Sequence, residues 1–425
     1  MNIQNVVTFV IVLATIIAVI NHRFLKLPTS IGVMSIAIIV SLVIMLTSDI
    51  FPTLFDGTTK LVTSVDFSNV FIGTLLNFLL FAGTIQIRIK DLRSQLLPVL
   101  LFSTLGVAVS SFAVAIILFY AFPLLHLDIP FLQCLLFGTL ISPTDPISVL
   151  AILRDSKMSK SLETKIAGES LFNDGVSLVL FFTILHALHN PWEKITFTSV
   201  AKIFVTEALG GLALGIALGF IGLRLLKNVN DYKIEVMITL AIVLGGYTLA
   251  RSLGISEPLT MVAAGIFIGN YGKAYAMSDT SGDYIDKFWE LIDEILNMVL
   301  FVLMGFELLI ITHFSNYWIA GLIAIPAILI ARFVSVYVSS LIIRLKEEMP
   351  FKTVAFLTWG GLRGGISIAL ALTLNEHHHG HLFVVITYFV VVFSIVVQGL
   401  SIERIAARRR KKMIQAKDDS LFKKD

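Results

Sequence analysis

Thirteen apolar segments follow one another along this chain, with little polar sequence between them. A helix needs about 20 consecutive apolar residues to cross the hydrocarbon core of a bilayer. Charged residues make up 14% of the 425 residues, and mean hydropathy is +0.90, whereas soluble domains carry about a quarter charged residues. The chain is therefore expected to be an all-α integral membrane protein. This composition excludes an ordinary soluble enzyme, a nucleic-acid-binding protein and a disordered chain.

The segments define the expected organisation of the chain. We expect transmembrane helices at residues 5–21, 29–47, 67–86, 95–121, 130–153, 163–189, 199–223, 234–251, 257–270, 288–312, 316–343, 351–374 and 382–403. The first segment lacks a basic region before it and a small-residue cleavage pattern after it, so we interpret it as a helix and not a signal peptide. Residues 1–405 would form one transport domain, and residues 406–425 a basic cytoplasmic tail.

Lysine and arginine are distributed unevenly between the two sides of the membrane. With thirteen crossings, 26 of the 32 basic residues fall in alternate loops on one side and in the C-terminal segment. The other side carries only four, which are Lys60, Lys194, Lys202 and Arg251. Because basic loops stay in the cytoplasm, the N-terminus is expected outside and the C-terminus inside. We expect a multi-pass protein of the plasma membrane, or of the inner membrane if the source is bacterial.

The fifth segment contains a carboxylate between two prolines, in the run Ser142-Pro143-Thr144-Asp145-Pro146. Each proline lacks an N–H group, so the carbonyls of Thr139 and Ser142 lose their helical donors. The helix should therefore break near its middle. Irregular backbone at membrane depth is tolerated only inside protein or beside a wet cavity. A broken helix with Asp145 at the break is typical of a cation site in a transporter.

The sixth segment carries a polar stripe along one helical face. Ser170, Asn173, Asp174 and Ser177 recur at the spacing of a single face, and Glu169 lies one position away from them. A charge at mid-membrane costs about 2.5–3.5 kcal/mol, so two carboxylates within six residues indicate a pathway and not packing alone.

Two arginines lie within apolar segments. A guanidinium in the membrane needs a carboxylate or free carbonyls, and Glu169 is the first candidate partner for Arg332. Arg363 lies among four glycines, in residues 360–365, where a second helix should break. The two broken segments, numbers 5 and 12, run in opposite directions. This predicts inverted repeats at about 1–190 and 232–405, joined by a connector at about 199–223, with Arg363 at the crossing.

Together, these motifs resemble the electroneutral sodium/proton exchangers, the first branch of the monovalent cation/proton antiporters. The matching strings are residues 142–146, 168–175 and 360–364, supported by residues 288–290, 301–305, 331–332 and 336–337. The resemblance spans nearly the whole hydrophobic chain. It implies a homodimer of thirteen-helix protomers in which one bundle of helices slides against another.

The resemblance also implies roles for the polar residues. Asp174 would be the main carrier of cation and proton, with Na⁺ held at Asp145, Ser170 and Asp174 and with Thr144 as a further ligand. The supporting residues would be Asn173 at the crossing, Arg363, and Glu169 paired with Arg332. One departure is that Ala82 stands where many relatives have glutamate, which bears on the choice between Na⁺, Li⁺ and K⁺.

The residues themselves suggest how exchange could be coupled. A bare carboxylate is costly to bury, so we expect Asp174 to hold either a cation or a proton whenever the site is closed. Asn173, directly before Asp174, stands in place of a second acid and leaves one titrating carrier, which favours 1:1 electroneutral exchange. The transported ions are the only expected ligands, with no cofactor and no enzymatic activity. The alternatives are a gated cation channel and a sodium-coupled organic-anion symporter in which Arg363 faces the substrate.

Three further sequence patterns allow less specific interpretations. Acidic residues at the start of the tenth segment, from Asp286 to Asn297, either guide cations or form a solvated helix end, which is the preferred interpretation. Gly211, Gly215 and Gly219 recur every fourth residue and predict close helix packing. The histidines of residues 377–381 are expected in an exposed outer loop, with metal binding or pH sensing as the alternatives.

Overall fold

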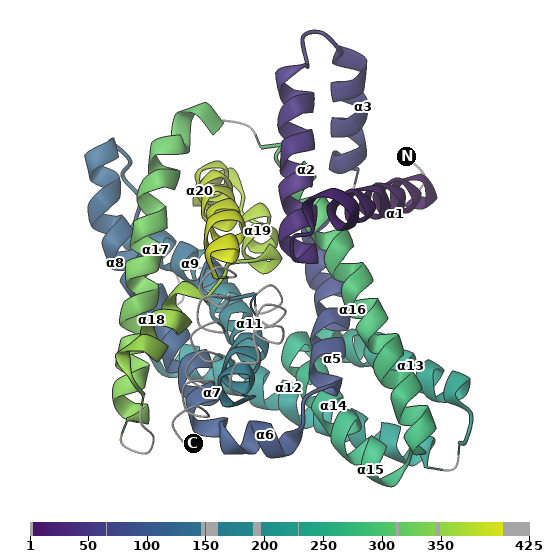
Figure 1. Cartoon of the computed structure of the whole chain (residues 1–425). Helices are drawn as coiled ribbons and strands as arrows, with labels where there is room; N and C mark the ends of the chain where they lie inside the picture. The colour runs from purple at the N-terminus through teal and green to yellow at the C-terminus, as the bar shows by residue number, and fades with distance from the viewer. Residues whose placement is uncertain are drawn as a thin grey trace, which may run out of the picture.

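A computed structural model describes residues 3–64, 66–145, 149, 160–189, 197–227, 229–311, 314–344 and 349–402. The described residues are built from helices (Figure 1). In chain order the α-helices are α1 Ile3–Ile20, α2 Thr29–Leu46, α3 Pro52–Thr63, α4 Phe67–Val70, α5 Leu76–Ile85, α6 Ile89–Ser94, α7 Leu96–Ser103, α8 Leu105–Ala121, α9 Phe131–Leu140, α11 Lys160–His189, α12 Phe197–Leu226, α13 Tyr232–Ser252, α14 Glu257–Phe267, α15 Lys273–Tyr275, α16 Asp279–Glu307, α17 Phe314–Ile343, α18 Phe351–Trp359, α19 Gly365–Leu372 and α20 Gly380–Val392.

Tighter and wider turns extend several of these helices. The π-helical segments are η1 Asn21–Leu25, η2 Phe71–Leu75, η4 Ile268–Gly272 and η6 Phe393–Gly399. The 3₁₀ segments are η3 Phe122–Leu125 and η5 Glu376–His378. The continuous helices η2–α5 and α20–η6 therefore cover most of the third and thirteenth predicted segments.

Nine helical stretches of the described chain are long and apolar enough to cross a membrane. The remaining predicted segments depart from that simple pattern for separate reasons. The fifth and twelfth are interrupted, α14 is short, and α16 carries six acidic residues in its first sixteen positions. Thirteen crossings therefore remain a prediction, while the membrane-spanning helical architecture is confirmed.

Two helix boundaries differ from the sequence prediction. Helix α16 begins at Asp279, nine residues before the predicted start, because Ser278 caps it by accepting a hydrogen bond from the Ser281 N–H at 3.2 Å. The same helix ends at Glu307, five residues before the predicted end. Helix α3, with Pro52 at its first turn, was not predicted because its polar composition resembles a loop.

The helices form two bundles (Figure 1). The first bundle contains α1, α2, α5, α12, α13, α14 and α16, and the second contains α7, α8, α9, α11 and α17 to α20. The bundles meet where α11 contacts α12 and α14, and where α16 contacts α19. Asp174 lies on α11 and the two broken segments lie in the second bundle, so the polar residues face the boundary between bundles.

The predicted glycine packing is present between α12 and α14. A Cβ on Gly211 would lie 2.6 Å from the Ser256 carbonyl oxygen, and a Cβ on Gly215 would lie 2.3 Å from the Thr260 carbonyl oxygen. A Cβ on Gly219 would likewise lie 2.6 Å from the Phe267 Cβ. The three glycines therefore allow the two backbones to approach more closely than side chains would permit.

Both predicted breaks are present, and they cross each other. Helix α9 ends at Leu140, and non-helical chain follows as far as Asp145; helix α18 ends at Trp359, and α19 begins at Gly365. The Asp145 N–H donates to the Leu362 carbonyl at 2.7 Å, in an antiparallel bridge. The continuation of the fifth segment, at 146–148 and 150–159, lies outside the described residues. The antiparallel contact agrees with opposite directions of the two segments, and the repeat boundaries remain a prediction.

Candidate functional site

Arg363 closes the gap that the prolines open in the fifth segment. Its buried guanidinium donates through Nη1 to the Ser142 carbonyl and to the Pro143 carbonyl, the latter at 3.1 Å. The Thr139 carbonyl is bonded instead by the Ser142 N–H at 3.2 Å, in a tighter turn. The Arg363 backbone N–H donates to Ser394 Oγ at 2.9 Å. The guanidinium of Arg363, from the twelfth segment, thus supplies a donor to the Ser142 carbonyl, whose helical donor is missing in the fifth segment.

Helix α11 is tied to the same crossing by its polar stripe. Ser170 Oγ donates to the Thr144 carbonyl, and Asn173 Nδ2 donates to Thr144 Oγ1 at 2.8 Å. Thr144, Ser170, Asn173 and Asp174 are all buried. The stripe therefore faces the crossing, and the Asn173 amide contacts the hydroxyl group of the broken segment.

Two carboxylates meet at this point. Asp174 and Asp145 line one cavity and lie close enough to interact electrostatically. Asp174 is 7% exposed, and within the described part of the chain its buried Oδ1 has no hydrogen-bond partner. Burial of an ionised carboxylate is unfavourable unless another group compensates its charge. The geometry therefore suits a proton or a cation at Asp174.

Glu169 turns away from the stripe and forms a buried ion pair with Arg332. The Arg332 Nη1 atom lies 2.5 Å from Glu169 Oε1, and Arg332 Nη2 donates to the Leu357 carbonyl at 3.4 Å. A Cβ on Gly361 would lie 2.6 Å from Arg332 Nε, so the guanidinium packs directly on the second broken segment. The pair connects α11, α17 and the crossing.

A cavity of about 550 Å³ leads from the side of the basic loops to these residues. Its deep end is lined by Thr144, Asp145, Ser170 and Asp174. Its charged lining nearer the loops consists of Arg88, Asp91, Glu163, Glu290, Asp293 and Glu294. Glu290, Asp293 and Glu294 of α16 therefore line the cavity, while Glu290 and Glu294 remain exposed, so the solvated helix end and the guidance of cations both stay predictions.

Sequence reasoning did not identify Asp91, Glu163 or Gln86 as cavity residues. They lie near helix ends, where a charged or amide side chain is normal, and no periodic pattern marks which of them faces inward. Ala82 is buried and is not among the residues that line the cavity; α5 instead contributes Leu79 and Gly83 to the wall.

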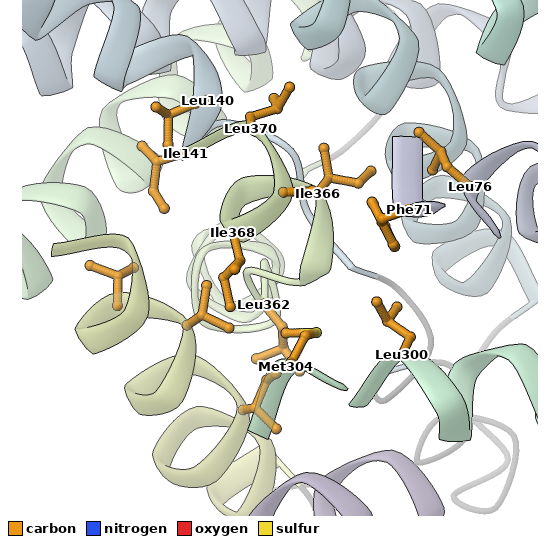
Figure 2. Close-up of a cluster of buried hydrophobic side chains, with 14 of the residues drawn as sticks. Phe71, Leu76, Leu140, Ile141, Leu300, Met304, Leu362, Ile366, Ile368 and Leu370 are labelled. Atoms are coloured by element: carbon orange, nitrogen blue, oxygen red, sulfur yellow. The ribbon is translucent and has the colours of Figure 1, made fainter. Parts of the chain in front are cut away.

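Apolar side chains also contribute to the cavity wall. Phe71, Leu76, Leu300 and Ile366 line its inner wall and belong to the buried cluster in Figure 2, which also includes Met304. These residues come from η2, α5, α16 and α19, so both bundles contribute.

Comparisons with known proteins agree with this architecture. The family model described as "Sodium/hydrogen exchanger, transmembrane" matches residues 10–408. The chain belongs to the sodium/hydrogen exchanger family. Among other members, it is 43% identical over 410 residues to the Na(+)/H(+) antiporter NhaP of Pseudomonas aeruginosa, covering 95% of this chain and 96% of that relative.

Further relatives extend the comparison. The Na(+)/H(+) antiporter NhaH of Halobacillus aidingensis is 31% identical over 397 residues, covering 92% of this chain and 94% of the relative. The solved structure of the sodium proton antiporter MjNhaP1 from Methanocaldococcus jannaschii has a similar fold, with a TM-score of 0.75 at 19% identity, covering 96% and 99% of the two chains. The predicted family and all-helical membrane fold are confirmed.

Gly364 places the second broken segment directly against Asp145, and the Gly364→Ala change tests this contact. An added Cβ would lie 2.8 Å from Asp145 Cβ and 3.2 Å from Asp145 Oδ2, so the carboxylate must move. Because overpacking costs about 1–3 kcal/mol, we expect the KM for sodium to rise about tenfold in a flux assay. The control is Gly245→Ala, where nothing lies within 4 Å. An unchanged KM in Gly364→Ala would contradict this account.

Proposed function

We propose that this exchanger-family member is a secondary antiporter that exchanges Na⁺ for H⁺ by alternating access. The observation that carries the proposal is the Asp174 carboxylate, which is buried at the deep end of a cavity beside Asp145, Thr144 and Ser170. Carboxylate, hydroxyl and carbonyl oxygens are the ligands that a hard monovalent cation prefers. The names of the relatives NhaP and NhaH as Na(+)/H(+) antiporters support the same pair of ions.

Competition for one site couples the two ions. Asp174 binds either the cation or the proton, and either one offsets the negative charge so that the loaded site can close. The empty, charged site is costly to occlude, so it does not cross. The sodium gradient therefore drives protons the opposite way, and the reverse, without ATP. Asp145, Thr144 and Ser170 contribute cation ligands, while Asn173 and the Glu169–Arg332 pair hold α11 in place.

This competition predicts how the apparent affinity for sodium depends on pH. Protons occupy the sodium site at low pH, so the apparent KM for sodium should rise up to about tenfold for each unit of acidification, with little change in the maximal rate. The measurement is sodium-driven exchange in proteoliposomes that contain a pH-sensitive dye. A maximal rate that falls with acidification at constant KM would contradict direct competition. Repeating the assay with Li⁺ and K⁺ determines the cation preference.

Electroneutrality is a separate part of the proposal. Within the polar stripe of α11, Asp174 is the acidic residue, and Asn173 stands before it in place of a second acid. One titrating carrier supports the exchange of one Na⁺ for one H⁺. We expect the exchange rate to be the same at clamped membrane potentials of 0 and −100 mV, since one net charge would be worth about 2.3 kcal/mol at the latter. Potassium gradients with valinomycin set these potentials. A several-fold change in rate would indicate an electrogenic stoichiometry.

The structure gives less support to the two rival functions. Arg363 bonds the carbonyls of the fifth segment and is not part of the cavity lining, which disfavours an organic-anion symporter that uses it for substrate. Phe71, Leu76, Leu300 and Ile366, which belong to the apolar cluster in Figure 2, form part of the cavity wall, and apolar side chains are less suited than polar groups to line an open pore for cations.

The position of the cavity mouth indicates how the protein is oriented in the membrane. The cavity mouth lies on the side of the basic loops, so the positive-inside rule makes this an inward-open conformation, with the N-terminus outside and the C-terminus in the cytoplasm. We infer a homodimer in the cytoplasmic membrane, as the family resemblance implies. The basic tail falls within residues 403–425, outside the described residues.

A further inference from the structure

Histidines gather at the end of the molecule opposite the cavity mouth. They come from the last turn of α11 and from the connection between α19 and α20, and they are His189, His377, His378, His379 and His381. An exposed polar loop was the preferred prediction for residues 377–381. The structure corrects this for His378, which is 7% exposed, and whose buried Nδ1 has no hydrogen-bond partner within the described part of the chain.

The histidines connect three helical elements. The ring of His378 lies edge-on to that of His189, with centroids 4.8 Å apart. Gln133, in the first turn of α9, bonds His379 Nδ1 at 2.5 Å through its Oε1 and donates to the His377 carbonyl at 3.3 Å. The outer ends of α9, α11 and α19 are therefore held together by imidazole and amide contacts.

The same three elements also carry or adjoin the residues of the ion site, at a distance along the chain from the histidines. Helix α9 leads into the segment with Thr144 and Asp145, α11 carries Asp174, and α19 begins beside Gly364. Alternating access moves the second bundle, which contains all three elements, relative to the first, so loosening of their outer ends would change the surface that this bundle presents to the first. A change in charge within the histidine contacts would act on that movement.

The chemistry of the contacts makes them sensitive to protons. Burial lowers the pKa of His378, and the neighbouring His189, His377 and His379 lower it further. Burial also lowers the pKa of His379. The other titratable groups nearby in the same elements are Glu376 and His381, which pair at 3.4 Å, and His186, one turn before His189 on α11.

The direction of the pH effect follows from the difference in proton binding between the packed and the loosened arrangement of the histidines. An exposed histidine has a pKa near 6.5, so a loosened arrangement binds more protons than the packed one when the outer pH falls below that value. The packed arrangement is therefore favoured at neutral and alkaline pH and is destabilised as the outer medium becomes acidic. Two adjacent imidazolium rings would also repel each other.

We propose that His378 and His189 form a proton-sensitive latch on the outer face, which holds the outer ends of α9, α11 and α19 together and releases them when the outer medium is acidified. The effect on transport rests on the proposed exchange function, whereas the release of the latch does not. The structural element is the connection between α19 and α20, which contains η5.

Hydrogen–deuterium exchange in lipid nanodiscs tests the release itself. The background is Asp174→Asn, which removes titration of the ion site. After correction for intrinsic rates, backbone amides in residues 374–382 should exchange at least tenfold faster at pH 5.5 than at pH 8. His378→Gln should abolish this difference, and the matched control His381→Gln, at a half-exposed position, should retain it. A pH-independent rate, or an equal response in His378→Gln, would overturn the latch.

A flux assay then tests the coupling to transport. In vesicles of uniform orientation, the outer pH is lowered from 8 to 6 at constant inner pH. The pH response of His378→Gln should differ from that of the wild type by at least threefold, with the KM for sodium at the inner face unchanged. Identical outer-pH profiles would show that the latch does not regulate exchange. If the protein exchanges no ions at all, the deuterium measurement still decides whether the latch exists.

Discussion

Replacing Asp174 with asparagine is expected to reduce sodium-driven proton movement to the level of protein-free vesicles, a loss of at least a hundredfold. The amide has nearly the shape of the carboxylate, but it neither takes up a proton nor offsets the charge of a cation. The buried Oδ1 atom and the neighbouring Asp145 place this side chain where both ions would bind. The measurement is dye fluorescence in proteoliposomes after a sodium jump.

A matched control separates loss of the carrier from loss of folding. Ser177 lies on the same stripe of α11, one turn beyond Asp174, is fully buried and is not among the residues lining the cavity. Ser177→Ala should therefore retain exchange within about twofold. Thermal unfolding of Asp174→Asn should match that of the wild type or exceed it, because an unpaired buried charge is removed. Sodium-coupled proton movement that persists in folded Asp174→Asn would refute the assignment.

The second large effect concerns stability. Replacing Glu169 with glutamine should destabilise the protein by about 3–5 kcal/mol, because it leaves the guanidinium of Arg332 buried without its counter-ion. The pair lies between α11, α17 and the residues near Gly361, so the loss should loosen the crossing as well. Thermal unfolding in a mild detergent, followed by tryptophan fluorescence, measures the change.

A double variant makes this prediction specific to the ion pair. Glu169→Gln combined with Arg332→Gln removes both charges, so neither side chain remains as an unpaired buried charge. The double variant should therefore be more stable than either single variant, with a coupling free energy of at least 1 kcal/mol. Additive losses would show that each side chain contributes through separate contacts. Hydrogen–deuterium exchange of residues 374–382 in the same variants then measures a region of the protein that is far from this ion pair.

Much of the architecture could be predicted because a bilayer restricts the possible folds. Apolar length identifies spans, and backbone groups in hydrocarbon must be bonded internally, so helices were the expected solution. The breaks followed from the two prolines around Asp145 and from the glycines around Arg363. The acidic helix α16 and the amphipathic helix α3 were placed less well, since hydropathy does not distinguish a polar helix from a loop.

Candidate residues could also be named from the free-energy cost of placing a charge in the membrane, because a charge within an apolar segment requires a compensating group. That argument singled out Asp145, Asp174, Glu169, Arg332 and Arg363, but it could not assign every partner. It anticipated Glu169 beside Arg332, and it located Arg363 only near the crossing. That Arg363 bonds the Ser142 and Pro143 carbonyls became apparent only in the structure.

By itself, the sequence determined the class of protein, the positions of the breaks and the set of costly charges. These properties depend on local composition and on the backbone chemistry of proline and glycine. The tertiary structure decided which loop acids line the cavity, which apolar side chains complete its wall, and that His378 is buried against His189. Such features arise when helices distant in sequence pack together, because the environment of a side chain is set by its neighbours in space.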